Sequence, residues 1–296
     1  MCRLFGMSGG SESVDATFWL LQASDSLSEQ SRREPDGTGI GFFTDDGQPV
    51  VSKQPLAAFE DRRFAEEAKD VQARTFVAHV RFASTGALTV ANTHPFEQDG
   101  RLFAHNGVIE GLPALESELG PEGMALVHGD TDSERWFALI TRAIARADGD
   151  VAAGIESATR WVAANLPLLS ANFVLIEADQ LWALRYPDGH ELHALERAAG
   201  GGGKSGPAPL HHRSSTGHIH VASDELAQRP AVVVATEPMD DDPGWRELGS
   251  GHLLHVDPQL RVTVTTVVEG PPAHQLTVAD LTGRAAGSQA DPPTPH

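Results

Sequence analysis

Two kinds of hydrophobic pattern alternate along the chain, and they predict strands and helices in both halves. Short apolar runs bounded by turn-forming residues predict strands at residues 2–9, 75–82, 101–105, 172–177, 180–185, 218–223, 231–236, 251–256 and 261–268. Apolar residues at helical spacing predict helices at residues 15–27, 59–69, 112–119, 135–147 and 154–165. This mixture of hairpins and amphipathic helices predicts an α+β fold.

Three glycines interrupt the apolar pattern near the N-terminus. Gly37, Gly39 and Gly41 alternate, so on a strand all three would face one side and leave room there for another backbone or a ligand. The order GxGxG, followed by Phe-Phe and no helix, does not match a phosphate-binding loop, and nucleotide binding is not expected. The Asp-Asp-Gly sequence at residues 45–47 then predicts a hairpin turn.

Asn106-Gly107 allows two interpretations. Between the apolar runs that flank it, Asn-Gly is a strong signal for a two-residue hairpin turn. The same two residues could instead place an amide and a freely approachable backbone N–H at a functional site. The local pattern alone favours the hairpin.

The chain is expected to form a single domain over residues 2–284. Residues 198–217 contain four consecutive glycines and little apolar sequence, which predicts a flexible insertion within this domain. The tail, residues 285–296, is rich in Pro, Gly and Ser and is predicted to be disordered.

Charge and composition narrow the classes of function. With 22 Lys and Arg against 41 Asp and Glu, the chain has a net charge of −19, and no basic stretch suggests nucleic-acid binding. No apolar run reaches the ~18–20 residues that cross a bilayer, and the N-terminus lacks the pattern of a signal peptide. The sequence therefore predicts a cytoplasmic protein that binds neither membrane nor nucleic acid.

Cys2 is the single cysteine among the 296 residues. One cysteine excludes an internal disulfide, and the histidines show no metal-ligand spacing, so neither a metal nor another cofactor is expected. If Met1 is removed, Cys2 carries both a thiol and a free α-amine, whose pKa of about 7.7–8.0 would let it act as general base for the thiol. The alternative is a small cysteine that merely begins a strand.

Six short motifs in a fixed order resemble one known family. They are MCRLFG at residues 1–6, PDGTGIGFF at 35–43, AHVRFAS at 78–84, THPF at 93–96, LFAHNG at 102–107 and DTDSE at 130–134. Together they resemble the class II glutamine amidotransferases of the N-terminal nucleophile (Ntn) hydrolase superfamily, in their small stand-alone form. The resemblance implies a four-layer α/β/β/α sandwich with two mainly antiparallel sheets.

The resemblance also implies a role for each of five residues. Cys2 would attack the γ-amide carbonyl of glutamine and form a γ-glutamyl thioester, while Asn106 and Gly107 would provide the oxyanion hole. Arg81 would hold the substrate α-carboxylate and Asp132 the α-ammonium. Outside this context, Arg81 would be expected in a surface ion pair and Asp132 as a helix cap.

Histidines occur within these motifs, but they are expected to be structural. His79 and His105 lie on predicted strands beside ligand residues, and the family uses the α-amine of its cysteine as the base. We therefore expect both rings to be buried with satisfied hydrogen bonds rather than to transfer protons.

Three functions remain open from the sequence. In the first, free glutamine is hydrolysed to glutamate and ammonia, and the ammonia passes to a separate acceptor enzyme. In the second, a γ-glutamyl peptide or conjugate is hydrolysed, as in relatives of ergothioneine biosynthesis and glutathione degradation. The third is a non-catalytic glutamine-binding module, which the intact Cys2 and Asn106-Gly107 disfavour.

Overall fold

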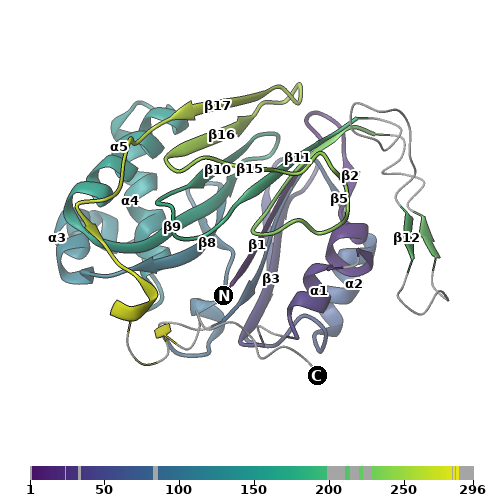
Figure 1. The fold of residues 1–296 in the computed structure, drawn as a ribbon, viewed down its shortest axis with the longest axis horizontal. Helices are drawn as coiled ribbons and strands as arrows, with labels where there is room; N and C mark the ends of the chain where they lie inside the picture. Colours follow the sequence, from purple (N-terminus) through teal and green to yellow (C-terminus); the bar gives the residue numbers. More distant parts are fainter. Residues whose placement is uncertain are drawn as a thin grey trace.

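The computed structural model describes residues 2–23, 25–32, 35–82, 86–198, 211–213, 220–222, 229–281, 283 and 285–286. Two large sheets lie face to face, with helices on both outer sides, as Figure 1 shows. The fold is thus the four-layer α/β/β/α sandwich that the family resemblance implies, and it confirms the α+β class that the hydrophobic pattern predicts.

The first sheet contains the start of the chain at its centre. Its strand order is β15 (Arg246–Glu247), β11 (His193–Arg197), β14 (Ala231–Ala235), β1 (Arg3–Ser8), β6 (Thr75–Arg81), β3 (Gly37–Phe43) and β4 (Pro49–Gln54). All of these neighbours pair antiparallel. The outer face is covered by the π-helix η1 (Phe18–Gln22), α1 (Leu27–Gln30) and α2 (Arg62–Asp70).

The second sheet is built from residues of the middle and C-terminal parts of the chain. Its order is β17 (Val262–Thr266), β16 (His252–Val256), β10 (Leu181–Arg185), β9 (Pro167–Ile176), β8 (Arg101–Ile109) and β7 (Phe96–Gln98). A short strand near the C-terminus, β18 (His274–Gln275), pairs parallel with the start of β9. Two small ribbons, β2 (Val14–Asp15) with β5 (Gln72–Ala73) and β12 (His211–Arg213) with β13 (His220–Ala222), complete the strands.

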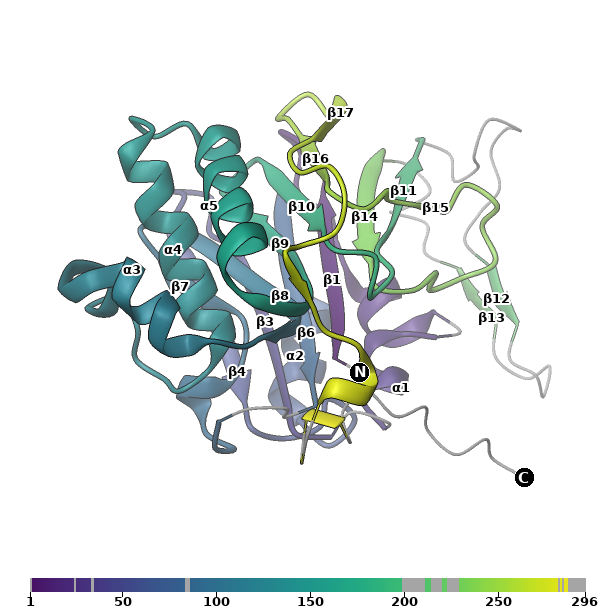
Figure 2. The same cartoon turned by 60° about the vertical axis from the view of Figure 1, so that its left-hand side comes forward.

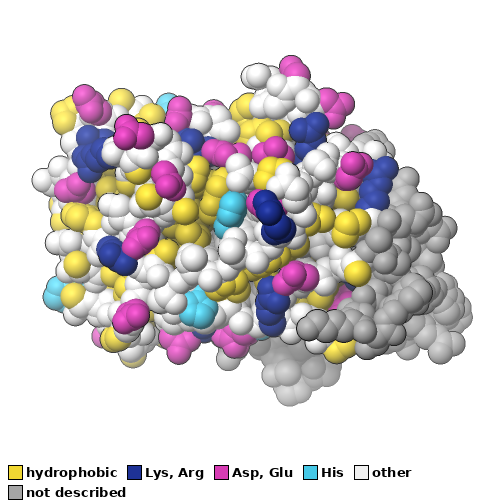
Figure 3. All heavy atoms as spheres, turned by 90° about the horizontal axis from the view of Figure 1, so that it is seen from above, with side chains coloured by type: hydrophobic (Ala, Val, Ile, Leu, Met, Phe, Trp, Pro, Cys, Tyr) yellow, Lys and Arg dark blue, Asp and Glu magenta, His cyan; other side chains and the backbone are white. Residues whose placement is uncertain are grey.

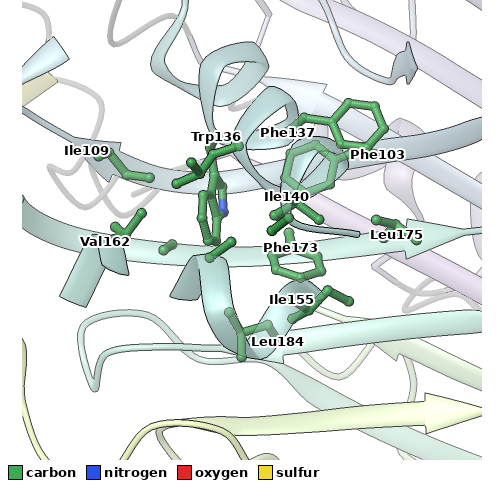
Figure 4. Packing of buried hydrophobic residues seen from close by; sticks show 14 of the residues in the cluster. Phe103, Ile109, Trp136, Phe137, Ile140, Ile155, Val162, Phe173, Leu175 and Leu184 are labelled. Carbon is green, nitrogen blue, oxygen red and sulfur yellow. The ribbon is translucent and has the colours of Figure 1, made fainter. Parts of the chain in front are cut away.

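Three helices cover the outer face of the second sheet and bury its largest hydrophobic cluster. They are α3 (Leu112–Met124), α4 (Asp132–Arg146) and α5 (Val151–Asn165). Figure 4 shows Trp136 and Phe137 of α4 packed on Phe103 and Phe173 of the sheet, and the rings of Phe103 and Phe137 stack at 4.7 Å. A separate apolar cluster fills the space between the two sheets.

The predicted helix at residues 15–27 is wrong in its extent. The structure instead has the ribbon strand β2, the five-residue η1 and the short α1. The Ser26 hydroxyl accepts a hydrogen bond from the Glu29 N–H and so starts a new helix after the break. Trp19 and Leu20 are fully buried, so packing on the sheet decides the local conformation here.

The predicted hairpin at Asn106-Gly107 is also wrong, because both residues lie within the continuous strand β8. Asn106 pairs with Asn172 and Gly107 with Ala171 on β9. The strand that pairs with these residues is β9, which begins about 60 residues later in the chain, after three helices. The chain therefore makes no local turn at Asn106-Gly107. The Asp-Asp-Gly turn at 45–47, by contrast, joins β3 to β4 as predicted, with Gly47 at a φ of 80°.

Most of the predicted insertion and tail lies outside the described residues. Within 198–217 the structure describes residue 198 and strand β12, and within 285–296 it describes residues 285 and 286.

Candidate active site

Cys2 lies at the start of β1, next to the end of β6. Its thiol group is half-buried and faces the main chain of Phe82: the Phe82 N–H donates to Sγ at 3.2 Å, and the thiol donates to the Phe82 carbonyl at 3.3 Å. Arg3 pairs with Val80, so the next position along the two strands brings Cys2 beside Arg81. Met1 is outside the described residues.

Arg81 is the last residue of β6 and is buried despite its charge. Only 3% of it is exposed, and its guanidinium donates to the carbonyl of Ala87 at 3.3 Å. Gly37 lies opposite Arg81 on β3, and a methyl group at Gly37 would be 3.2 Å from Thr93. The guanidinium is already out of water in the folded protein, so binding a carboxylate would add little desolvation cost on the side of Arg81. Arginine also forms strong, two-pronged pairs with carboxylates, which supports the candidate role of Arg81.

The glycine stripe brings the two sheets together at this end of the sandwich. A Cβ at Gly39 would lie 2.1 Å from the His94 carbonyl oxygen, and one at Gly41 would lie 2.9 Å from Pro95. Residues 93–95 therefore run along β3 toward β7, whose Phe96 pairs with Phe103 on β8. Because β7 and β8 are antiparallel, the Asn106 end of β8 comes to the same end of the sandwich as Cys2 and Arg81. The close approach expected for the stripe is confirmed.

Gly107 is required by the packing of β8 on β9. A Cβ there would lie 1.8 Å from the carbonyl oxygen of Ser170, a distance that no side chain could accept. The strand pairing also shifts here: Val108 pairs with Ser170, but Ile109 pairs with Leu168, so Leu169 is an extra residue in β9. The Ser170 hydroxyl donates to the Asn106 carbonyl at 3.1 Å and fixes the main chain of the candidate oxyanion strand.

Asp132 connects the second sheet to the start of α4. It is 2% exposed, and its Oδ2 accepts the Ile109 N–H at 2.9 Å, while the Thr131 hydroxyl caps the helix. The carboxylate is thus held at the end of β8, near Gly107. The helix-cap interpretation of Asp132 is wrong, because Thr131 takes that position.

His105 has a partner for both ring nitrogens, as expected for a structural histidine. Nε2 lies 3.3 Å from the Ser170 carbonyl, which can only accept, so Nε2 carries the proton. Nδ1 lies 2.9 Å from the Ser133 hydroxyl and must therefore accept from it. Burial lowers the pKa of His105, and the nearby Asp132 carboxylate opposes this shift.

His79 differs from that expectation. Its ring is fully buried against His94, with centroids 4.1 Å apart, and no nitrogen of either ring has a hydrogen-bond partner of normal geometry among the described residues. Burial, with Arg81 and His105 nearby, lowers the pKa of His79 to about 3, and an interaction with the His105 main chain opposes the shift. Burial also holds the pKa of His94 well below its usual value. Both rings are therefore neutral at physiological pH beneath the candidate site.

Lys53 fastens the segment that joins the two sheets. Its ammonium donates to the Pro95 carbonyl at 3.0 Å and lies 4.9 Å from the centre of the Phe96 ring. Burial lowers the pKa of Lys53 to about 8, and Glu134 opposes the shift. No local pattern indicated this contact, because Lys53 and Pro95 are 42 residues apart.

The structure thus gathers all five predicted residues at one end of the sandwich, together with residues that sequence reasoning missed. The missed residues are Ser133, Ser170, Thr93 and His94, which contact the main chain or side chains around the site. Thr93, His94 and Ser133 lie inside motifs that were recognised, so their positions were available; Ser170 lies in none.

Other binding classes find no support in the described part of the chain. There, no group of three or more His, Cys, Asp and Glu side chains is arranged to hold a metal ion. No described helix is long and apolar enough to cross a membrane. On the face in Figure 3, basic side chains lie singly or in small groups among acidic ones rather than in a broad basic patch.

Comparison with known proteins places this geometry in context. The family model for class II glutamine amidotransferases matches residues 1–276. The γ-glutamyl-hercynylcysteine sulfoxide hydrolase of Mycobacterium tuberculosis is 30% identical over 285 residues, which cover 92% of this chain and all of that protein. The putative glutamine amidotransferase YafJ of Escherichia coli is 27% identical over 262 residues, covering 85% of this chain and 95% of that one.

The fold is shared with a larger enzyme. Glutamine phosphoribosylpyrophosphate amidotransferase from B. subtilis superposes with a TM-score of 0.60 at 19% identity, over 91% of this chain and 50% of that one. The chain also spans less than two thirds of the length of several curated relatives, 63% of one and 21% of another.

Proposed function

The chain belongs to the class II glutamine amidotransferases, and we propose that it hydrolyses the γ-amide bond of glutamine to give glutamate and ammonia. One observation carries the proposal: the Cys2 thiol lies at the end of the sandwich that also holds Arg81, Asn106-Gly107 and Asp132. A nucleophile, an oxyanion hole and partners for both α-substituents of a glutamyl group are then within one site. A protein that only binds glutamine would need neither the nucleophile nor the oxyanion hole.

The reaction begins once Met1 has been removed. The α-amine of Cys2 takes the thiol proton, and Sγ attacks the γ-carbonyl carbon. The Phe82 N–H, 3.2 Å from Sγ, stabilises the developing thiolate. The oxyanion is stabilised by the Asn106 side-chain amide and the Gly107 N–H. The C–N bond then breaks, the leaving nitrogen takes the proton from the α-amine, and a γ-glutamyl thioester remains.

Water completes the cycle. The α-amine, neutral again, takes a proton from a water molecule that attacks the thioester carbonyl. The C–S bond breaks, glutamate leaves, and the proton returns to the Cys2 sulfur. No metal or cofactor takes part in this scheme.

Two charged residues hold the glutamyl group. Arg81 binds the α-carboxylate through its planar guanidinium, and Asp132 binds the α-ammonium. Both side chains are almost fully buried and anchored by the main chain, at Ala87 and Ile109 respectively. They would recognise any γ-glutamyl compound, whatever its leaving group.

A second candidate is therefore a γ-glutamyl peptide or conjugate hydrolase of the ergothioneine-biosynthesis or glutathione-degradation type. The match covers the whole length of the Mycobacterium tuberculosis relative, whose name describes such a hydrolase, and 92% of this chain. If free glutamine is the substrate, a separate enzyme would accept the ammonia.

The test follows glutamate and ammonia release from glutamine and from a panel of γ-glutamyl compounds. Wild-type protein is compared with Cys2→Ala, and intact-mass measurement reports whether Met1 is present. Release that is lost in Cys2→Ala, from protein without Met1, supports the mechanism. Full activity in Cys2→Ala, or in protein that keeps Met1, would show that the mechanism is wrong.

A further inference from the structure

We propose that His105 is a positioning residue of the site: its neutral ring ties the start of α4, where Asp132 would hold the α-ammonium, to the strands that form the proposed oxyanion hole. The inference rests on the proposed function and extends it to a residue that does not touch the substrate. The mechanism proposed for Cys2 makes no use of this ring.

The two ends of the glutamyl group would be bound along one edge of β8. Gly107 pairs with Ala171, whose N–H donates to the Tyr186 carbonyl at 2.7 Å, next to β10. The main chain of Ala171 is therefore directed away from β8, and the Gly107 N–H is directed away from β9. Ile109, two residues further along, points its N–H to the same edge and donates to Asp132. The two N–H groups are about 7 Å apart along the strand, a span that an extended γ-glutamyl group can bridge.

The His105 ring lies directly against Gly107. Both residues alternate in step with Phe103 and Ile109, which pack in the cluster beneath the helices, so they share that face of β8. A Cβ on Gly107 would lie 2.8 Å from Nε2 of His105, so the missing side chain makes room for the ring. The ring thus supports the main chain that carries the proposed oxyanion donor.

The Nε2–H group acts on the same peptide through Ser170. It donates to the Ser170 carbonyl at 3.3 Å, while the Ser170 hydroxyl donates to the Asn106 carbonyl at 3.1 Å. The Asn106 carbonyl and the Gly107 N–H belong to one planar trans peptide unit, so they point in opposite directions. Holding this carbonyl against Ser170 therefore aims the Gly107 N–H at the free edge of β8.

The opposite side of the ring holds the start of α4. Nδ1 accepts from the Ser133 hydroxyl at 2.9 Å, and the same hydroxyl lies 3.5 Å from Oδ1 of Asp132. Burial lowers the pKa of His105, with Asp132 opposing the shift, so the ring is neutral at pH 7 and Nδ1 can accept. A hydroxyl has one proton, and the closer Nδ1 takes it. Without an acceptor at position 105, Ser133 would donate to Asp132 and weaken its attraction for an ammonium group.

Figure 2 shows the three elements that the ring connects: α4 lies across the outer face of the second sheet, with β8 and β9 side by side behind it. A neutral imidazole suits this place because it carries one donor and one acceptor at fixed positions of a rigid ring. Glutamine offers the same pair of groups on a flexible chain, and leucine offers neither.

The experiment measures steady-state kinetics on glutamine and on γ-glutamyl-p-nitroanilide for His105→Leu and His105→Gln. We expect His105→Leu to lower kcat about tenfold, because the Gly107 N–H is no longer aimed, and to raise KM about fivefold, because Ser133 turns to Asp132. His105→Gln should stay within about threefold of wild type in both constants. The control for the exchange is His255→Leu, a half-buried histidine on β16 whose Nε2 lies 2.9 Å from Gln180, and it should change neither constant.

A double variant separates positioning from support of the fold. Adding Ser133→Ala to His105→Leu removes the hydroxyl that would turn to Asp132. KM should then return to within about twofold of wild type, while kcat stays low. The inhibition constant of glutamate, which presents the same α-groups without reacting, should follow KM. Two substitutions that only weakened the fold would not improve binding.

Three results would overturn the proposal. Unchanged kcat and KM in His105→Leu would mean that the ring is only structural, and equal losses in His105→Gln and His105→Leu would mean that its hydrogen bonds do not matter. A double variant whose KM is no lower than that of His105→Leu would mean that Ser133 does not compete for Asp132. If His105→Leu does not fold, His105→Asn, whose shorter amide cannot reach both serines, takes its place in the same comparisons. Wild-type protein that hydrolyses neither substrate would instead contradict the proposed function, and the role of His105 with it.

Discussion

Two regions of the molecule are built by different means. On the proposed glutamyl side, Arg81 and Asp132 are nearly fully buried charges, each tied to the main chain of a neighbouring segment. The C-terminal segment, residues 274–281, is instead held by the two-residue strand β18 and the contacts of Leu281. The first region lies within two large sheets, and the second is added at the start of β9.

The proposed role of the first region explains this difference. Every γ-glutamyl compound presents the same α-carboxylate and α-ammonium, and charges recognise them well only when they are placed rigidly and already desolvated. A short segment at the surface can vary without disturbing the two sheets. Substitutions on the proposed glutamyl side should therefore have large effects on activity, and substitutions in the C-terminal segment small ones.

The largest effect is expected at the oxyanion hole. Gly107→Ala would place a methyl group 1.8 Å from the Ser170 carbonyl and force β8 and β9 apart. Asn106→Ala removes the other donor without such a clash. We expect each variant to lower kcat by ~10²–10³ on glutamine and on γ-glutamyl conjugates alike, as steady-state kinetics would measure.

Gly6→Ala is the matched control for the loss of a glycine. A Cβ there would lie 2.7 Å from a methyl group of Val174 between the sheets, so it should lower the thermal midpoint without reaching the site. If Gly6→Ala and Asn106→Ala reduced kcat by the same factor, the loss would reflect general destabilisation, and the assignment of the oxyanion hole would be wrong.

The next effect is expected at the carboxylate partner. Arg81→Lys keeps the charge but loses the planar, two-pronged donor, so we expect kcat/KM to fall about 10²-fold, mainly through KM. The loss should be the same for glutamine and for γ-glutamyl-p-nitroanilide, because both present the same α-carboxylate. A loss confined to one substrate would place Arg81 on the leaving-group side.

Arg101→Lys is the control for replacing an arginine by a lysine. Arg101 lies at the other end of β8 and pairs with Asp99 and Glu177, both partly exposed. Partly exposed ion pairs contribute little, and the kinetics of this variant should stay within twofold of wild type.

The residues proposed for the glutamyl side could be picked out in the sequence because they lie in compact motifs that resemble those of a known family. The alternation of Gly37, Gly39 and Gly41 predicted the close approach of another backbone, which residues 93–95 make. The position of Asn106-Gly107, however, was misjudged by local rules, because the strand that pairs with β8 is distant in sequence. Asn-Gly forms a hairpin turn only where the residues on its two sides pair with each other.

The contacts of the C-terminal segment could not be predicted in the same way. Leu281 meets Val108 across more than 170 residues, and nothing in the pattern around it suggests burial. The stacking of His79 on His94 also depends on tertiary packing, which brings a strand and a loop together. Sequence periodicity reports which face of an element is buried but not what covers it.

The smallest effect is a change of stability with pH. Three buried histidines, His79, His94 and His105, lie near the proposed glutamyl side, and burial lowers the pKa of each. The shift is large for His79 and His94, so the unfolded chain takes up protons at these two residues below about pH 6.5, whereas the folded chain does not. Their contribution to stability is therefore present above pH 6.5 and is lost as the pH falls below it, by about 1.4 kcal/mol for each of the two histidines between pH 7.5 and 5.5.

Urea unfolding at these two pH values would measure the effect. In the double variant His79→Gln/His94→Gln, the difference in the free energy of unfolding between pH 7.5 and 5.5 should shrink by about 2–3 kcal/mol, because glutamine does not titrate. His274→Gln, on the exposed strand of the C-terminal segment, should follow the wild-type curve. An unchanged pH dependence in the double variant would mean that both rings can be protonated in the folded protein. The glutamyl side would then be less rigidly desolvated than its two buried charges require.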